Sequence, residues 1–290
     1  MKPLRIRLEQ ARQRTGMGWE VLERDYMLSW ILVGISRHEQ LCETLVFKGG
    51  TALKKCYFGD YRFSEDLDFS GLTGVPVGED METAIEGVCR TATELLDEYA
   101  PVRIEWERYT EREPHPAGQE AFTVRVQLPW QKQAQTRVMV EIAVDEKVLK
   151  PPCLRSVVHE YGEPIEADVQ VYGLEEIVAE KLRAILQHRR MLEERGWSRS
   201  RARDYYDIWR ILGAYQDRLD LTDFEGLVRA KCDLRRVDFR GPDDFFDDAM
   251  LAYVERTWSQ WLGNLVPELP TFNKVIGQLR PQIAAILRNG

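Results

Sequence analysis

Two carboxylates placed two residues apart are the part of this sequence that most directly suggests chemistry. Asp66 and Asp68 lie in the segment SEDLDF at residues 64–69, where polar and apolar residues alternate as in a strand. Alternate side chains of a strand point to one face, so the two acids would share a small volume. Their mutual repulsion favours a bound cation, and a few hard oxygen ligands suit Mg²⁺ bridged to substrate phosphates. The pair therefore predicts metal-assisted chemistry on a phosphate.

A glycine-hinged turn lies shortly before the acids, in the segment FKGGTALKK at residues 47–55. The pair Gly49-Gly50 lets the backbone approach a ligand, and a helix opening at Thr51 presents unpaired N–H groups to an anion. The segment does not fit the ATPase pattern G-x-x-x-x-G-K-[ST]. The turn and the acids together predict a triphosphate beside a metal, which is the arrangement of nucleotide transfer.

A third carboxylate, Glu141, lies in an alternating segment at residues 138–144 and projects to the face opposite the valines. It would reach the metal if this strand lay beside the strand of Asp66 and Asp68. The alternative is a solvated carboxylate on an exposed face. Asp145, at the same parity, is the reserve candidate.

The elements that must position these residues follow from hydrophobic periodicity. We expect an α/β front half and a helical back half. Helices are predicted at residues 18–38, 51–58, 79–99, 174–194, 201–214, 222–232, 243–262 and 272–288. Strands are predicted at residues 44–47 and 66–69, and, as successive and largely antiparallel neighbours, at 102–106, 122–128 and 138–144. Glycines make residues 71–78 a loop, and residues 114–118 are expected to lie in a strand connection.

Pro151-Pro152 and the irregular sequence after it predict a domain boundary, because proline interrupts both strand and helix. The expected organisation is a core over residues 1–150, a linker over 151–172 and a helical domain over 173–290 that completes the active-site cleft.

The first two helices of the back half carry a second candidate group. In a helical hairpin Lys181 could face Asp204, and Asp207 is an i, i+3 neighbour of Asp204 that could orient the lysine. Lys181 and Lys54 would then be the cations for the phosphates. A solvated interhelical salt bridge is the alternative for Lys181. For Lys55 and Arg62, which flank the turn and the acids, simple solvation is the alternative.

Composition excludes several classes of protein. The chain has 290 residues, 44% of them hydrophobic, a net charge of −8, and no apolar run long enough for a membrane helix. Its start lacks the apolar core of a secretory signal, so the cytoplasm is expected. The five cysteines are isolated from one another, which favours neither a zinc site nor a disulfide framework. The histidines are scattered and suggest no imidazole chemistry; they are His38, His115, His159 and His188.

Net acidity also argues against a protein that coats nucleic acid nonspecifically. A local basic region nevertheless exists, because residues 181–210 contain nine basic and four acidic residues. Such a region could bind nucleic acid.

Several segments, in this order, resemble the AbiEii/AbiGii nucleotidyltransferase toxins, which include the MenT toxins and belong to the DNA polymerase β type superfamily. The resemblance covers roughly residues 20–215 and rests on ERDY (23–26), FKGGTALKK (47–55), RFSEDLD (62–68), VEI (140–142), EKLRA (180–184) and RDYYDI (203–208).

The resemblance implies an α+β fold, with a polymerase β-like core of mixed sheet and flanking helices and a C-terminal helical domain. It implies the toxin of a bacterial toxin–antitoxin pair used against phage, with an antitoxin protein as partner. Such a toxin moves a nucleotide from an NTP to an acceptor, in MenT-like members the 3′ end of tRNA, and so blocks aminoacylation. Transfer to a protein side chain, as in AMPylation, is one alternative. A catalytically idle RNA- or antitoxin-binding module is another.

By this likeness two Mg²⁺ would be held by Asp66, Asp68 and Glu141, and the other essential groups would be Lys181, Asp204 and Asp207. The nucleotide would be bound by Gly49, Gly50, Thr51, Lys54, Arg62 and Ser64. Ser64 also falls where some relatives are silenced by phosphorylation, which would add about −2 charge to an anionic site.

Overall fold

The structure is a computed structural model that describes residues 1–110, 118–196 and 199–288. The chain divides into two compact units, Met1–Tyr172 and Gly173–Gly290. The connection expected at residues 114–118, with His115, falls almost wholly outside the described residues.

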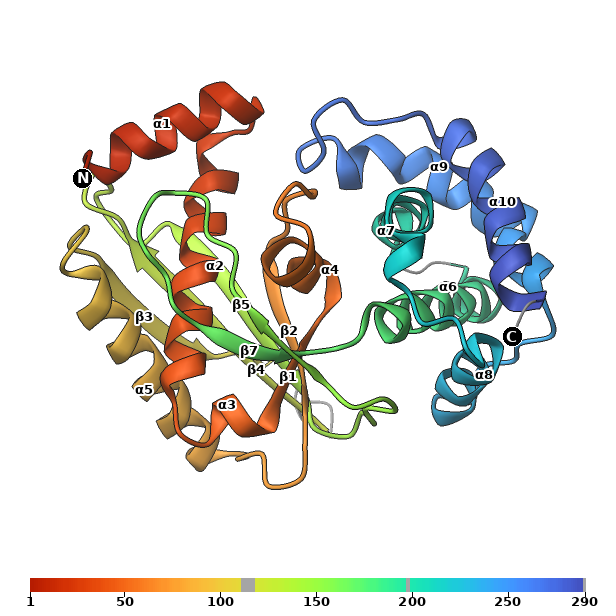
Figure 1. Cartoon of the computed structure of the whole chain (residues 1–290), viewed down its shortest axis with the longest axis horizontal. Helices are drawn as coiled ribbons and strands as arrows, with labels where there is room; N and C mark the ends of the chain where they lie inside the picture. Colours follow the sequence, from red (N-terminus) through yellow and green to blue (C-terminus); the bar gives the residue numbers. More distant parts are fainter. Residues whose placement is uncertain (111–117, 197–198, 289–290) are drawn as a thin grey trace. The chain divides into compact units, whose positions relative to one another are not determined.

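The first unit is built on a mixed sheet (Figure 1). In the described part of the chain its strands are β1 (Leu45–Lys48), β2 (Asp66–Gly71), β3 (Arg103–Arg108), β4 (Gln119–Gln127), β5 (Thr136–Ala143), β6 (Cys153–Ser156) and β7 (Asp168–Val171). They lie in the order β3-β4-β5-β2-β1-β7-β6. β2 pairs in parallel with β5 and β1 in parallel with β7, whereas the other neighbours are antiparallel. The successive antiparallel strands β3, β4 and β5 confirm the prediction for this part of the chain.

Most helices of the first unit contact this sheet directly, whereas the first helix packs mainly on the second (Figure 1). They are α1 (Leu4–Thr15), α2 (Trp19–Arg37), α3 (Leu41–Thr44), α4 (Gly49–Ala52) and α5 (Glu79–Leu96). The central strands supply the buried core, in which the rings of Phe47 and Phe69 stack at 5.1 Å between centroids, next to Val140 and Ile142. Because side chains alternate along a strand, the polar residues between these apolar ones point to the opposite face.

One expectation for the first unit is wrong, and one helix was missed. Residues 151–172 are not a linker, because β6 and β7 lie there and extend the sheet beyond β1. Pro151-Pro152 directly precedes β6 and therefore ends one connection without ending the unit. Helix α1 was not predicted. Leu4, Leu8 and Ala11 form its buried stripe, but five charged residues among them weaken the apolar periodicity (Arg5, Arg7, Glu9, Arg12, Arg14).

In the described residues of the second unit all regular elements are helical. They are α6 (Leu174–Arg195), α7 (Ala202–Ala214), α8 (Phe224–Leu234), α9 (Asp248–Leu262) and α10 (Phe272–Arg288), with short 3-10 turns at Gln216–Arg218 and Pro242–Phe246. The helix expected at 243–262 is interrupted at Asp247, whose Oδ1 accepts the Met250 N–H at 3.0 Å and caps α9. The α+β class with a helical C-terminal part is confirmed. No helix in the described part of the chain is both long and apolar enough to cross a bilayer.

Candidate functional site

A row of charged residues crosses the middle of the sheet. Lys48 of β1 pairs with Asp68 of β2, and Asp68 pairs in parallel with Glu141 of β5. Paired residues on neighbouring strands project to the same face, and Asp66, two residues from Asp68, shares that face. The strand of Glu141 therefore lies beside the strand of Asp66 and Asp68, which was the condition for Glu141 to reach the same site. Asp66 and Asp68 are half-buried, whereas Glu141 is exposed.

The glycine turn packs directly against these acids. Gly49 has φ +80°, and a Cβ placed on it would lie 2.6 Å from the Asp68 Oδ2. A Cβ on Gly50 would collide with the guanidinium of Arg62. A side chain at either position would have to displace one of these charged groups, and at Gly49 the backbone conformation favours glycine as well. The chain then continues as α4 and, without a break, as a π-helical turn at Leu53–Tyr57.

Thr51, Arg62 and Ser64 support the turn from the inside. The Thr51 hydroxyl donates to the Asp66 carbonyl oxygen at 2.5 Å, which ties the helix after the turn to β2. Arg62 is only 4% exposed and donates through Nη1 to the Phe63 carbonyl at 3.0 Å, so the solvated alternative is wrong for it. Ser64 is buried too. Their roles toward a nucleotide stay predictions.

Both lysines after the turn are buried. The Lys54 Nζ donates to the Gly59 carbonyl oxygen at 2.8 Å and pairs with Glu160 at 3.2 Å. Lys55 pairs at 2.8 Å with Asp25 of α2, so a solvated Lys55 is wrong as well. Burial lowers the pKa of the Lys55 ammonium. Burial alone would raise the pKa of the Asp25 carboxyl, but the charges of Lys55 and Lys54 hold it below its usual range.

A second buried cluster surrounds Glu163. Its carboxylate pairs with Arg7 of α1, accepts the Tyr26 hydroxyl of α2 at 2.7 Å, and lies 3.0 Å from the His159 Nε2. Burial would raise the pKa of Glu163, but the hydrogen bonds from His159, Arg7 and Tyr26 together hold it at about 2. Burial also lowers the pKa of His159. This histidine therefore belongs to the support of α1 and α2.

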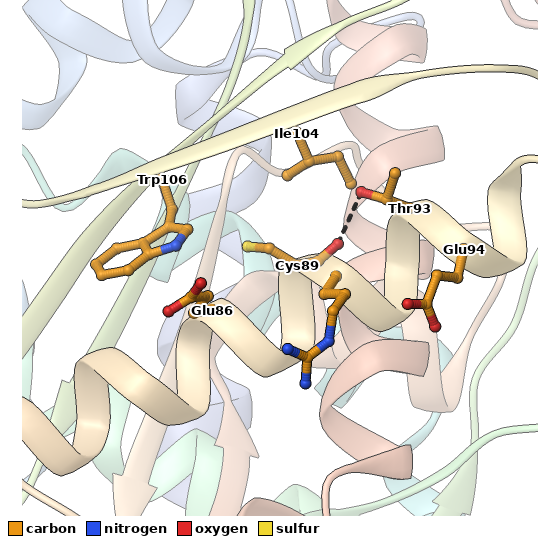
Figure 2. Close-up of a pocket in the computed structure, with 7 residues that line it drawn as sticks. Glu86, Cys89, Thr93, Glu94, Ile104 and Trp106 are labelled. Carbon is orange, nitrogen blue, oxygen red and sulfur yellow. Dashed lines mark hydrogen bonds between the residues drawn. The ribbon is translucent and has the colours of Figure 1, made fainter.

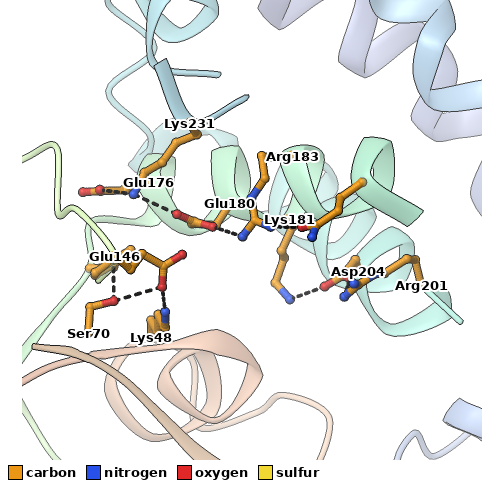
Figure 3. A network of polar contacts seen from close by, with 12 residues as sticks. Lys48, Ser70, Glu146, Glu176, Glu180, Lys181, Arg183, Arg201, Asp204 and Lys231 are labelled. Carbon is orange, nitrogen blue, oxygen red and sulfur yellow. Dashed lines mark hydrogen bonds and ion pairs between the residues drawn. The ribbon is translucent and has the colours of Figure 1, made fainter. Parts of the chain in front are cut away.

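Lys48 has contacts that the sequence did not suggest. Its ammonium forms an ion pair with Glu146, and the Ser70 hydroxyl donates to the same Glu146 Oε2 at 3.2 Å (Figure 3). The Ser70 hydroxyl also shares a hydrogen bond of 2.9 Å with the Tyr172 hydroxyl. The one signal in the sequence was the position of Lys48 immediately before the glycine pair. Glu146 carried none, because it follows the predicted strand at no distinctive spacing.

The predicted facing of Lys181 and Asp204 is present within the second unit. The Lys181 Nζ lies 2.9 Å from the Asp204 Oδ1 (Figure 3). It also lies 2.8 Å from the Asp207 Oδ2, so α6 donates to two carboxylates of α7. The Lys181 side chain is 9% exposed and that of Asp207 is fully buried, so the solvated form of the salt bridge is wrong. Arg201 also approaches Asp204, at 3.5 Å.

A neighbouring ion-pair network on α6 and α8 was not predicted. Lys231 is buried and pairs with Glu176 at 2.7 Å and with Glu180 at 2.8 Å, and Glu180 pairs with Arg183 (Figure 3). The i, i+4 spacing of the two glutamates was visible in the sequence, but Lys231 is remote in the chain. This network joins α8 to α6 and has the character of a structural tie.

Neither a ready-made cluster of metal ligands in the described residues nor a reactive thiol at Cys89 is found. Among the described residues no group of three or more His, Cys, Asp or Glu side chains is already gathered to hold a metal ion. A hollow of about 290 Å³ lies between α5 and β3 and is lined in part by Cys89, Ile104 and Trp106 (Figure 2). Burial raises the pKa of the Cys89 thiol to about 12, so this thiol is unreactive near neutral pH.

Comparison with known proteins adds a family to this geometry. The sequence profile described as "Nucleotidyl transferase AbiEii toxin, Type IV TA system" matches residues 30–289. A search among curated proteins found no match. Among solved structures, the chain is similar in fold to MenT4, a nucleotidyltransferase toxin from Mycobacterium tuberculosis H37Rv, with a TM-score of 0.60 and 22% sequence identity. That similarity covers 94% of this chain and 85% of MenT4.

The family match extends over both units, from α2 to the end of α10. It therefore includes the glycine turn, the acids of the sheet and the Lys181 cluster. The chain belongs to the AbiEii family of nucleotidyltransferase toxins of type IV toxin–antitoxin systems.

Proposed function

We propose that this toxin uses Mg²⁺ to transfer a nucleotide from an NTP to the 3′ end of tRNA in the bacterial cytoplasm, as part of a defence against phage. The observation that carries the proposal is the contact of the Gly49-Gly50 turn with Asp68 and Arg62, on the sheet face that Asp66 and Glu141 share. Backbone that can approach phosphates and carboxylates that can hold a metal are adjacent there. An idle binding module has no need of that combination.

The side chains on this face fit Mg²⁺ by donor chemistry. Protein sites for Mg²⁺ commonly supply one or two carboxylates and leave the other positions to water and substrate phosphates. Asp66 and Asp68 match that number, and Glu141 lies in register with Asp68 as a third donor. Two bound Mg²⁺ would supply charge stabilisation for the attacking 3′-hydroxyl and the departing pyrophosphate.

The chain's own groups would do the rest of the binding. The turn at Gly49 and Gly50 would direct backbone N–H groups at the triphosphate, and Thr51 would hold the turn in place through its bond to the Asp66 carbonyl. Lys181, which pairs with Asp204 and Asp207, would neutralise phosphate charge, and the two carboxylates would orient its ammonium. Asp145, which is exposed, is the reserve for Glu141.

An RNA acceptor is supported by charge. The region 181–210 is basic in a chain of net charge −8, and acidic phosphates are its natural partner. Arg199 and Arg203 place their guanidinium groups 5.7 and 5.4 Å from the ring centroid of Trp261, a planar basic and aromatic surface of the kind on which bases stack.

Control by the antitoxin is proposed at Ser64. A phosphate on this hydroxyl would add about −2 charge close to Asp66 and would repel both acids and nucleotide. Ser64 is 8% exposed, so the segment before β2 must open for a modifying enzyme to reach it.

Incubation with Mg²⁺, each labelled NTP and total tRNA tests the proposal. Wild type is compared with Asp66→Ala and with the matched control Asp60→Ala, which removes an exposed acid of the same unit. We expect label on RNA from wild type and Asp60→Ala and none from Asp66→Ala. Equal labelling by Asp66→Ala would overturn the assigned site. Label that survives RNase and follows the protein fraction would overturn the tRNA acceptor in favour of a protein side chain.

A further inference from the structure

Lys48 stands at the junction of β1 and the glycine turn, on the face of the sheet that carries the acids. In the β1–β2 register Lys48 lies opposite Asp68, and the next residue in the chain is Gly49. We propose that Lys48 binds a phosphate of the NTP, and that Glu146 holds its ammonium until the nucleotide takes the place of the carboxylate. This inference rests on the proposed nucleotidyl transfer and adds a specific phosphate-binding residue to it.

The strand register puts the ammonium where the phosphates would lie. Lys48, Asp68 and Glu141 form one row over β1, β2 and β5, so their side chains share a face. The Gly49 backbone, which lies against the Asp68 carboxylate, begins immediately after Lys48. A triphosphate between the turn and the acids would therefore place an oxyanion beside this lysine.

The contacts of Glu146 allow the exchange. The Lys48 and Glu146 side chains are 18% and 8% exposed, so the lysine is within reach of a ligand while its partner stays inside. A phosphate oxygen can replace a carboxylate oxygen as the anionic acceptor of the ammonium. When Lys48 turns to a phosphate, Glu146 keeps the hydrogen bond from the Ser70 hydroxyl. The carboxylate is then not left without a donor, which would be costly in a half-buried position.

The other lysines of the segment are held elsewhere. Lys54 is 3% exposed, and its ammonium group contacts the Gly59 carbonyl oxygen and Glu160. Lys55 is 2% exposed, and its ammonium group contacts Asp25. Breaking either arrangement would leave a buried charge without its partner. Among the lysines of residues 47–55, Lys48 is thus the one whose geometry allows a change of partner.

The competing interpretation is a structural tie, in which the ion pair only fastens the segment after β5 to β1. A charge swap separates the two interpretations, because Lys48→Glu combined with Glu146→Lys restores a salt bridge but removes the cation from its place beside Gly49. A tie predicts that stability and NTP affinity recover together in the swap. A phosphate-binding lysine predicts that stability recovers and NTP affinity does not.

The experiment measures affinities of the full chain for each NTP and for the matching nucleoside with Mg²⁺ present, together with Tm. We expect Lys48→Met to weaken NTP binding at least about tenfold, or about 1.4 kcal/mol, and to leave nucleoside binding unchanged. Lys48→Arg should retain most of the NTP affinity. Glu146→Gln should bind NTP as tightly as wild type or more tightly, because a competing anion is gone. Lys132→Met, which removes an exposed lysine of the same unit, should change nothing.

Wild-type NTP affinity in Lys48→Met, or recovery of NTP affinity in the charge swap, would overturn the inference. Should Lys48→Met fail to fold, Glu146→Gln decides: NTP binding that weakens in step with Tm contradicts the exchange, and retained or tighter binding supports it. Failure of the proposed function would look different. Wild type itself would then bind and transfer no nucleotide.

Discussion

The two units use buried charge in opposite ways. In the first unit the candidate acids lie half-buried or exposed on a sheet face, and two buried ion pairs, Lys55 with Asp25 and Arg7 with Glu163, lie elsewhere. In the second unit Lys181 and Asp207 are themselves a buried ion pair. Under the proposed function, the acids of the sheet face would carry the chemistry apart from these buried ion pairs, whereas Lys181 and Asp207 would carry both chemistry and structural support.

This difference has a physical consequence. Removing one partner of a buried ion pair leaves a charge in a medium of low dielectric, which costs far more than removing an exposed charge. Substitutions on the sheet face should therefore affect activity with little effect on folding, whereas substitutions in the Lys181 cluster should affect both.

Asp68→Asn should lower nucleotide transfer at least about a hundredfold, because it removes a charged ligand of the proposed Mg²⁺. Its free energy of unfolding should stay within about 0.5 kcal/mol of wild type or increase, since repulsion from Asp66 is relieved. Transfer assays and urea denaturation of the same preparations measure both, with Asp60→Asn as the control. A large loss of stability would break the proposed separation in the first unit.

Asp207→Asn should destabilise the protein by about 3 kcal/mol, at the low end for a broken buried pair because Lys181 keeps Asp204. Transfer should fall in the same variant. The control is Asp243→Asn, an exposed acid of the same unit whose pair with Arg280 is 3.7 Å long. If Asp207→Asn lost activity at unchanged Tm, the second unit would separate chemistry from support as the first does.

The free energy of unfolding should decrease as pH falls, because Glu163 becomes protonated. Its folded pKa of about 2 lies below the ordinary value of 4.5, so its contribution is complete above about pH 5 and is lost as pH falls toward 2. The loss between about pH 5 and 3 should be about 2 kcal/mol in wild type and much smaller in Glu163→Gln. Urea midpoints over this range measure it. Equal slopes in both proteins would remove Glu163 as the cause.

Gly49→Ala should cost about 1 to 2 kcal/mol of stability, because alanine is strained at φ +80° and its Cβ would press on the Asp68 Oδ2. The displaced carboxylate should also lower transfer about tenfold. Gly16→Ala is the matched control, since Gly16 has φ +72° but its Cβ would meet nothing within 4 Å. Equal effects on transfer would show that the contact with Asp68 is unimportant.

The sequence by itself determined those features that depend on neighbours along the chain. Period-two alternation put Asp66 and Asp68 on one face of a strand, and helical spacing put Asp204 and Asp207 on one side of α7, because both depend only on local backbone geometry. The family likeness also came from contiguous motifs. For the same reason the main helices and the central strands were predictable within a few residues.

Tertiary structure decided which of these residues meet. The order of strands places Glu141 beside Asp68 and adds β6 and β7, from the segment expected to be a linker, to the sheet. The fold also places Glu146 within ion-pair distance of Lys48. It also buried Lys55 and Arg62, which the sequence left as solvated alternatives. Strand pairing and burial depend on contacts between residues remote in the chain, and these leave no periodic signal. The turn and its two acids were thus visible in the sequence, whereas the charged row to which they belong appeared only in the fold.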